Sequence, residues 1–308
     1  MKNFINISDH SSSDLRAIID EAKTRKLSRK GFNKSAPDDD KPFEGKSMAM
    51  IFEKPSTRTR MSFDIAAKQL GGSSIILNPD GIHYGKGDET LKDTAKVLTE
   101  YVDIVMLRTS SHKNLEEFGK HLEIPMITGL SDKSHPCQIM SDILTYEESN
   151  GLITGKTVSW LGDGDNNMSN SLIEAAGKFK FNLKIGCPKK YSPGKKILGW
   201  AKKNKVNLLI TQKPDEAVKN SDCVMTDKWV SMNDKVNKKT KKKVLKPFQV
   251  NKKLMKKANS NAIFMHCLPV GRGEEVTDEV IDGKQSVVWR QALNRVHAQK
   301  SIIKWCLD

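Results

Sequence analysis

Cysteine is scarce in this sequence, and the few cysteines that it has are scattered. Cys137, Cys187, Cys223, Cys267 and Cys306 are odd in number and form no C-x-x-C pair. This spacing argues against the disulfide framework of a small secreted protein and against a paired-cysteine zinc site. The simplest compartment for such a chain is a reducing one, and we therefore predict a cytoplasmic protein.

Long apolar runs are also missing. Residues 1–10 contain no apolar core of the signal-peptide type, and no apolar run approaches the length of a transmembrane helix. We therefore expect neither a leader nor a membrane partner.

Positive charge, by contrast, is abundant. Lysine and arginine number 52, aspartate and glutamate 37, and the net charge is +15. Such an excess suits an anionic substrate, a nucleic acid or a membrane surface. No basic-aromatic motif accompanies it, so we favour a lysine-rich solvated surface over nucleic-acid binding. The length of 308 residues favours two domains with a sizeable core.

Short apolar segments alternate with segments of helical periodicity along the chain. The predicted strands are 47–52, 74–77, 104–107, 125–128, 157–161, 182–186, 207–211, 223–226 and 262–265. The predicted helices include 91–101, 115–121, 138–149, 169–179, 193–204, 214–220 and a closing helix at 291–305, with two earlier ones around Leu15 and Phe63. This alternation predicts parallel sheets that are covered by helices on both faces.

The alternation restarts after Asn150-Gly151. We therefore predict an α/β protein of two doubly wound parallel-sheet domains, at 1–148 and 149–290, with the helix 291–308 packing back on the first. The active site is expected in the interdomain cleft, beyond the carboxyl ends of the strands. The lysine-rich segment 235–246 reads as a solvated loop, or as a mobile lid.

The most specific motif follows the first predicted strand. Residues 52–60 read F-E-K-P-S-T-R-T-R, so a proline turn leads into a helix whose first amides attract anions. Ser56, Thr57 and Thr59 add hydroxyl groups, and Arg58 adds a guanidinium that fits phosphate oxygens. An ordinary helix cap needs only one hydroxyl. The motif therefore predicts a phosphate site.

Four further motifs follow in order. They are Met106-Leu107-Arg108-Thr109, His135-Pro136-Cys137-Gln138, the segment 227–232 (D-K-W-V-S-M) and His266-Cys267-Leu268-Pro269. With S-T-R-T-R, this set resembles the aspartate and ornithine carbamoyltransferases over nearly the whole chain. The resemblance implies transfer of the carbamoyl group from carbamoyl phosphate to the side-chain amine of ornithine, giving citrulline and phosphate in arginine metabolism. It also implies a homotrimer without a metal or an organic cofactor.

The resemblance assigns residues to carbamoyl phosphate. These are Ser56, Thr57, Arg58, Thr59, His83, Arg108, His135, Gln138, Cys267, Leu268 and Arg295. Thr59, Arg108 and His135 would surround the carbonyl oxygen, which becomes negative when the amine attacks, and one such donor contributes roughly 3 kcal/mol. Gln138 would hold the carbamoyl amino group. His83 stands where the family has a glutamine supplied by a neighbouring subunit.

The resemblance also assigns an acceptor pocket. Its residues are Leu130, Asn167, Asp227, Ser231 and Met232. Asn167 would bind the carboxylate of ornithine and Asp227 its α-ammonium, while Cys267 would help to place or deprotonate the δ-amine. The predicted catalytic set is Arg108, His135, Cys267 and Asp227. Asn233 follows Met232 where the ornithine enzymes have glycine, and asparagine tolerates a positive φ better than other replacements.

Several readings compete with this one. Read without the family, His135 and Cys267 are structural side chains and Asp227 is a helix cap or a surface charge. Another acceptor (putrescine, agmatine or aspartate) is the nearest alternative, but a diamine needs no clamp for an amino-acid head. A nicotinamide dehydrogenase is disfavoured because Asn167 occupies the third glycine position of the G-x-G-x-x-G pattern that starts at Gly162.

Overall fold

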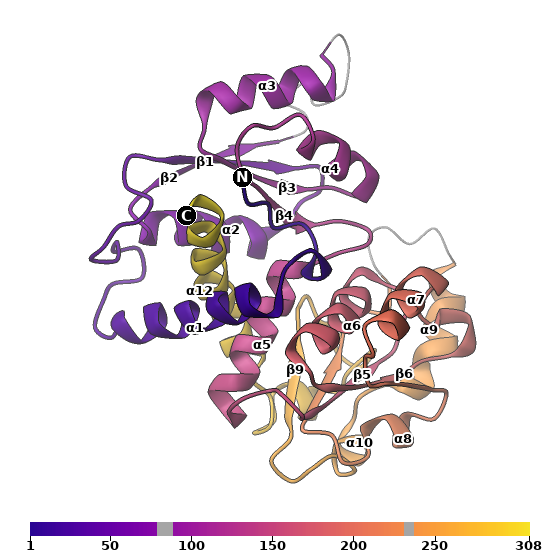
Figure 1. The fold of residues 1–308 in the computed structure, drawn as a ribbon. Coiled ribbons are helices and arrows are strands. Elements are labelled where there is room, and N and C mark those ends of the chain that lie inside the picture. Colours follow the sequence, from indigo (N-terminus) through magenta and orange to yellow (C-terminus); the bar gives the residue numbers. More distant parts are fainter. Residues whose placement is uncertain (79–88, 231–236) are drawn as a thin grey trace. The chain divides into compact units, whose positions relative to one another are not determined.

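The computed structural model describes residues 1–78, 89–230 and 237–308. Contacts divide the chain into two compact units: unit 1 comprises Met1–Ser141 with Leu293–Asp308, and unit 2 comprises Asp142–Ala292. Each unit is a parallel sheet with helices packed against it (Figure 1). The predicted site residues His83, Ser231 and Met232 lie outside the described residues.

Unit 1 is built on a four-stranded sheet. Its strands are β1 (Ser47–Phe52), β2 (Ser73–Leu77), β3 (Ile104–Arg108) and β4 (Met126–Leu130). They pair in parallel in the order β2-β1-β3-β4. The inner strands β1 and β3 are near-continuous apolar runs, as strands buried on both faces require. The edge strand β2 is more exposed than they are.

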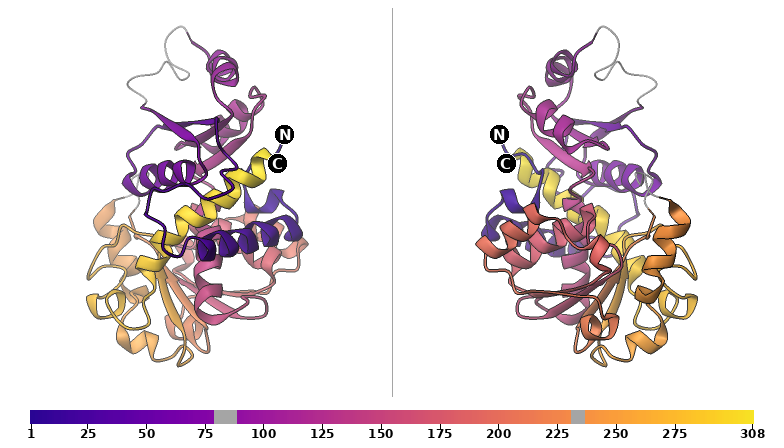
Figure 2. Two further views of the ribbon diagram at one scale, coloured as in Figure 1. Left: turned by 90° about the vertical axis from the view of Figure 1, so that its left-hand side faces the viewer. Right: turned by 90° about the vertical axis from the view of Figure 1, so that its right-hand side faces the viewer.

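Helices cover both faces of this sheet (Figure 1). They are α1 (Ser12–Ser28), α2 (Thr57–Gln69), α3 (Leu91–Tyr101), α4 (His112–Gly119) and the C-terminal part of α12 (Val288–Leu307). Ala49 and Val105 point to one face and pack with residues of α3 and α4, because successive side chains of a strand alternate between faces. The two chain ends lie close together in this unit (Figure 2).

Unit 2 is built on a five-stranded sheet. Its strands, β5 (Thr157–Leu161), β6 (Asn182–Gly186), β7 (Leu208–Thr211), β8 (Cys223–Thr226) and β9 (Ile263–His266), pair in parallel in the order β7-β6-β5-β8-β9. The helices are α6 (Asn167–Phe179), α7 (Lys195–Lys203), α8 (Pro214–Val218), α9 (Lys238–Leu245), α10 (Lys252–Met255) and α11 (Asp278–Ile281). Helix α5 (Pro136–Asn150) contributes residues to both units.

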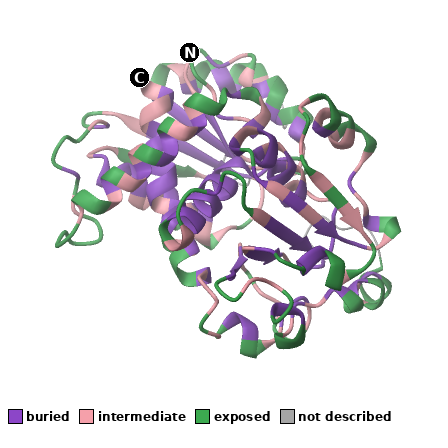
Figure 3. Cartoon of the chain, turned by 60° about the horizontal axis from the view of Figure 1, so that its bottom comes forward, coloured by how far each residue is buried: buried purple, intermediate pink, exposed green. Residues whose placement is uncertain are grey.

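The predicted fold class is confirmed, because both sheets are wholly parallel and alternate with helices along the chain. Buried strands and half-buried helices follow the apolar pattern from which they were predicted (Figure 3). In the described part of the chain, no helix combines the length and the apolar character needed to cross a bilayer.

The prediction of a solvated loop at 235–246 is wrong for the residues that the structure describes. Lys238–Leu245 form the helix α9, and the side chains of Lys241 and Leu245 are buried. The helix has one inward face that Leu245 anchors, and Lys241 reaches a carboxylate partner, which offsets the cost of burying its charge.

A buried ionic cluster joins both ends of the chain within unit 1. Asp38 accepts from Arg25, Arg29 and Lys300, and the ammonium of Lys300 lies 2.6 Å from its carboxylate. Burial opposes ionisation of Asp38, but the hydrogen bonds from Lys300 and Arg29 outweigh it and hold the pKa of Asp38 below its usual range. Burial lowers the pKa of Lys300 to about 8, which leaves it charged at pH 7.

We predict that Asp38→Asn destabilises the protein by roughly 3–5 kcal/mol, because it leaves the buried ammonium of Lys300 without its carboxylate, whereas Arg25 keeps Asp40 and Glu21. A carboxylate with a depressed pKa in the folded state adds stability above its unfolded pKa, near ~3.9, and that stability is lost as the pH falls through the folded value. The acid-induced fall in stability should therefore be shallower in the variant. Urea unfolding across pH, with the exposed neighbour Asp39→Asn as control, measures both effects. Equal stability of the two variants would contradict the prediction.

Candidate active site

Almost all the predicted site residues that the structure describes follow the carboxyl end of a strand. Ser56 to Thr59 follow β1, Arg108 ends β3, and His135 and Gln138 follow β4. In unit 2, Asn167 follows β5, Asp227 follows β8, and Cys267 with Leu268 follows β9. Arg295 is the exception, since it lies within α12. This edge is where ligands bind in parallel α/β sheets.

Helix α2 begins at the phosphate motif. Ser56 is its N-cap, and the side-chain oxygen accepts from the backbone N–H of Thr59 at 3.3 Å. Ser56 is therefore an N-cap residue, and the helix start that it caps is also the predicted phosphate site. The first amides of a helix lack partners within the helix and carry its positive dipole end, so they can bind an anion.

Thr59 lies at the centre of what we call the guanidinium cluster, which comprises Arg58, Thr59, Arg108, His135, Gln138 and Arg295. Its buried hydroxyl accepts from Arg108 at 3.4 Å and from Arg295 at 3.1 Å. Arg295 also donates to the amide oxygen of Gln138 at 3.2 Å. Residues far apart in the sequence thus meet around a single hydroxyl group, all of them in unit 1.

Within this cluster His135 is neutral. Burial lowers the pKa of its imidazole well below the usual value, and the positive charges of Arg295, Arg108 and Arg58 lower it further. A neutral imidazole carries one N–H donor, which suits the polarisation of a carbonyl oxygen. The predicted members of the carbonyl-oxygen site, Thr59, Arg108 and His135, are therefore brought together.

In unit 2 the predicted residues Asp227 and Cys267 form an acid–thiol pair. The thiol of Cys267 donates to Oδ1 of Asp227 at 3.1 Å, and the backbone N–H of Lys228 donates to the same oxygen at 2.7 Å. Both side chains are half-buried. The pair places a carboxylate and a thiol where one ligand amine could contact both.

The loop that carries Cys267 is held by a residue pair that the sequence did not indicate. The backbone N–H of Leu268 donates to Nδ1 of His266 at 2.9 Å, so Nε2 carries the proton and donates to Glu275 at 3.2 Å. Both side chains are fully buried. This network holds Leu268 at a φ of +58°, in the left-handed region that leucine rarely adopts.

Among the described residues, one group of possible metal ligands converges, namely Asp227, His266 and Cys267, whose ligand atoms lie within 4.8 Å of one another. Both ring nitrogens of His266 are already engaged, by Leu268 and by Glu275. Metal binding through this histidine would break one of these bonds and release the loop. We therefore give the group a role in shaping the loop.

Backbone conformation and close packing explain the glycines in the turn before α6. Gly162 adopts a φ of +120°, and a Cβ there would lie 3.3 Å from Nε1 of Trp229. A Cβ at Gly164 would lie 2.9 Å from the carbonyl oxygen of Tyr191. Packing inside the protein thus requires both glycines, which weakens the dinucleotide reading. Asn166 caps the helix, and Asn167, its first residue, is half-buried.

Three predicted residues lie in a different unit from the rest of their set. Leu130 was assigned to ornithine but belongs to unit 1, where its carbonyl accepts from the N–H of Thr109. Cys267 and Leu268 were also assigned to carbamoyl phosphate but belong to unit 2. Their predicted contacts, and the placement of the site in a cleft, stay predictions.

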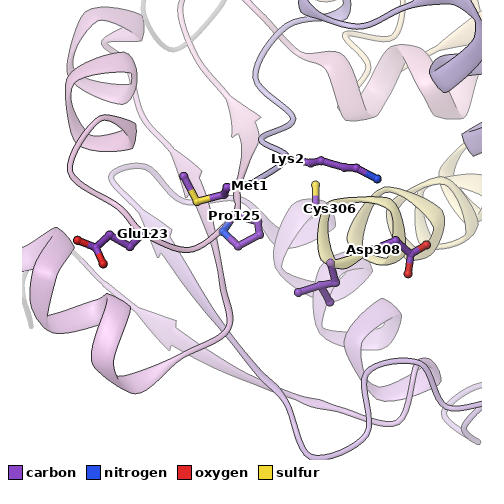
Figure 4. Close-up of a pocket in the computed structure, with 7 residues that line it drawn as sticks. Met1, Lys2, Glu123, Pro125, Cys306 and Asp308 are labelled. Carbon is purple, nitrogen blue, oxygen red and sulfur yellow. The ribbon is translucent and has the colours of Figure 1, made fainter.

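A pocket at the chain ends is separate from the guanidinium cluster in its lining. Figure 4 shows it among Met1, Lys2, Glu123, Pro125, Cys306, Leu307 and Asp308. None of these is a predicted site residue. Burial raises the pKa of the Cys306 thiol well above its usual value, so this sulfur is a poor nucleophile.

The fold and the two clusters define a class: a two-unit parallel α/β protein with an anion-binding helix start in one unit and an acid–thiol pair in the other. Two family models match nearly the whole chain. The carbamoyl-phosphate-binding domain of aspartate/ornithine carbamoyltransferases matches residues 2–148, and the Asp/Orn-binding domain matches residues 154–306. The chain belongs to the aspartate/ornithine carbamoyltransferase family.

Similar proteins carry the name of one branch of this family. An ornithine carbamoyltransferase of Brucella ovis is 49% identical over 308 residues, which cover 100% of this chain and 96% of that protein. One from Rhizobium meliloti is 49% identical over 306 residues, covering 99% and 98%. The structure of the Pyrococcus furiosus ornithine carbamoyltransferase superposes with a TM-score of 0.91 at 41% identity, covering 98% of this chain and 96% of that one.

We predict that Arg58→Ala lowers kcat/KM on the order of 100-fold, because a hydrogen bond between charged groups contributes about 1.5–3 kcal/mol. Calorimetry should show a matching loss of affinity for carbamoyl phosphate, with an unchanged melting temperature. Arg16→Ala, which removes an arginine paired with Asp20 on α1, is the control and should behave like the unaltered protein. Normal affinity in the Arg58 variant would remove the phosphate assignment.

Proposed function

We propose that this protein transfers the carbamoyl group of carbamoyl phosphate to the δ-amine of L-ornithine, giving citrulline and phosphate. The observation that carries the proposal is the convergence of Arg108 and Arg295 on the Thr59 hydroxyl beside the neutral His135, at the start of α2. This arrangement supplies cations for a phosphate and fixed donors for a carbonyl oxygen in a single place.

In the proposed complex the phosphate group binds the first amides of α2 with Ser56, Thr57 and Arg58. The carbonyl oxygen receives hydrogen bonds from Thr59, Arg108 and His135. The carbamoyl amino group donates to the side-chain oxygen of Gln138, which Arg295 orients. The 1–148 region is accordingly the carbamoyl-phosphate domain of the proposal.

The acceptor is assigned to the 149–290 region. Asn167 would bind the carboxylate of ornithine and Asp227 its α-ammonium, with Ser231 and Met232 completing the pocket. Cys267, which donates to Asp227, would lie beside the δ-amine. An ornithine acceptor is favoured over putrescine or agmatine, because neither amine has a carboxylate for Asn167 to bind.

The reaction follows from these positions. The neutral δ-amine attacks the carbonyl carbon, and the C=O bond opens to an oxyanion that Thr59, Arg108 and His135 stabilise. As the oxyanion collapses, the bond between the carbon and the phosphate oxygen breaks, and phosphate leaves with the electron pair. The amine proton passes to the departing phosphate, and transfer proceeds by positioning and electrostatics. The reverse reaction would use the same residues.

An assay of ureido products with ornithine, putrescine, agmatine and aspartate side by side tests the acceptor. We expect turnover with ornithine and background signal with the other three, because only ornithine presents both an amino-acid head and a side-chain amine at the required distance. Equal or better turnover with a diamine or with aspartate would reject ornithine and retain carbamoyl transfer.

Cys267→Ser should lower kcat with ornithine roughly tenfold, less than Arg58→Ala lowers turnover, because a serine hydroxyl still donates to Asp227 but is shorter and harder to polarise. Cys306→Ser, at a thiol that lines the pocket at the chain ends, is the control and should keep its ornithine kinetics. Unchanged kinetics in the Cys267 variant would dismiss the role of this thiol.

We also propose a homotrimer, with His83 of each subunit serving a neighbour. The edge strand β2 supports self-association, because Ile75 and Ile76 point to opposite faces and yet are 49% and 41% exposed. Met61 on the adjacent helix α2 is exposed as well. An apolar sheet edge left in water invites pairing with another chain.

Ile76→Lys should therefore shift the protein from trimer to monomer, because it introduces a charge into the proposed contact. Sedimentation velocity at several concentrations measures the change. Leu209→Lys provides a matched control, since Leu209 is 39% exposed on the edge strand β7 of the other sheet. A trimer that survives Ile76→Lys intact would place the contact elsewhere.

The cellular setting completes the proposal. All five cysteines are free thiols and four of them are buried, which fits a reducing cytoplasm. Citrulline is the product of the proposed reaction, and we propose a role in arginine biosynthesis.

A further inference from the structure

Lys241 is a buried cation that the proposed reaction does not use. Its side chain, on α9, is 4% exposed and lies 2.6 Å from Oδ2 of Asp163. On another side its ammonium lies 5.2 Å from the centre of the Tyr191 ring, within the range of a cation–π interaction. Its neighbour Lys242 forms a half-exposed ion pair with Glu274, so burial distinguishes Lys241 among the lysines of this helix.

The partner carboxylate shapes the turn that leads to Asn167. Oδ1 of Asp163 accepts from the backbone N–H of Asp165 at 2.9 Å. The carbonyl oxygen of Asp163 accepts from Nε1 of Trp160 at 2.8 Å and from the side chain of Asn166 at 3.1 Å. Asn166 in turn caps α6. The ion pair therefore acts on the residue that fixes the start of the helix.

Helix α9 also supports the segment that follows Asp227. Leu245 forms one buried apolar cluster with Tyr191, Trp229 and Val230. The indole of Trp229 lies against Gly162, the first residue of the turn before α6. One helix thus contacts both segments of the proposed acceptor pocket, through Lys241 at the Asn167 turn and through Leu245 beside Asp227.

We propose that Lys241 is a positioning residue for the acceptor amino acid: its ion pair with Asp163 fixes the turn that presents Asn167 to the acceptor carboxylate. This inference rests on the proposed function, which assigns Asn167 to the acceptor.

The electrostatic reason is local. Asp165 is an exposed residue, but partial desolvation of its carboxyl group raises its pKa, and the nearby charge of Asp163 raises it further. Lys241 pairs with Asp163, and its charge acts on Asp165 in the opposite sense, so it offsets the repulsion between two carboxyl groups on one short turn. Its removal would leave Asp163 buried without compensation beside a second acid, and such a charge costs several kcal/mol unless the structure moves or a proton binds. The turn, and Asn167 with it, is then displaced.

The test compares Lys241→Met with Lys241→Arg, which keeps the charge, and with Lys242→Met, the matched control on the same helix. At saturating carbamoyl phosphate, Lys241→Met should raise the KM for ornithine at least about tenfold, the size expected when the displaced Asn167 loses its hydrogen bond to the charged carboxylate. Calorimetric affinity for carbamoyl phosphate should stay within about twofold, because its assigned ligands at 56–59, 108, 135, 138 and 295 lie in unit 1. The two assigned ligands in unit 2, Cys267 and Leu268, are held by Asp227 and His266 and not by Lys241. The arginine variant should recover most of the loss.

Hydrogen exchange gives a second readout that needs no turnover. The amides of residues 162–169 should exchange faster in Lys241→Met and at the unaltered rate in Lys242→Met. If Lys241→Met fails to fold, the double variant Asp163→Asn with Lys241→Met removes the unpaired charge, and a smaller rise in KM and in exchange is expected, because the ion pair that fixes the turn is still missing.

The possible results distinguish a failure of the positioning role of Lys241 from a failure of the proposed function. An ornithine KM within about twofold of the unaltered value, or unchanged exchange at 162–169, overturns the positioning role while carbamoyl transfer stands. Equal losses of affinity for both substrates also overturn it, since they indicate a structural lysine only. If the unaltered protein binds carbamoyl phosphate but does not turn over ornithine, the acceptor assignment falls, and the exchange data alone decide whether Lys241 fixes the turn.

Discussion

The structure of unit 1 depends on holding positive charges close together around a buried hydroxyl group. Arg108 and Arg295 both donate to Thr59, and burial, reinforced by their charges and that of Arg58, keeps His135 neutral by lowering its pKa. The hydrogen bonds described for this cluster join the guanidinium groups to a hydroxyl and to an amide oxygen. Such a cluster is stable only because the sheet, the start of α2 and helix α12 fix its members, and it favours a dianionic ligand.

The proposed acceptor residues follow a different principle. In unit 2 the proposed site residues are held in place by partners of their own: Cys267 by the half-buried Asp227, and Leu268 by the buried pair His266 and Glu275. The same holds for the turn before Asn167, which packs against Trp229 and Tyr191. A pocket for an amino acid must present donors and acceptors at fixed distances, and rigid supporting contacts achieve this.

Most of the fold could be predicted from the sequence, because buried parallel strands are continuous apolar runs and their flanking helices show clear periodicity. The strands β1, β5, β6 and β8 have the predicted bounds. The meeting of Thr59, Arg108 and His135 was also expected, because the family resemblance implies that they surround one carbonyl oxygen. The helix α9 was missed because its lysines indicate solvent in any local window, and the burial of Lys241 depends on Asp163, which is distant in the sequence. The pairing of His266 with Glu275 was also missed, because it too depends on a partner outside the local motif.

The chain order of unit 1 has a consequence for biosynthesis. Arg295 completes the guanidinium cluster, yet it is encoded after the whole of unit 2. The ribosome therefore releases Ser56, Thr59, Arg108 and His135 well before it releases Arg295. The nascent chain cannot assemble the full cluster until unit 2 has been translated, so the proposed carbamoyl-phosphate site is completed only after the proposed acceptor domain has been made.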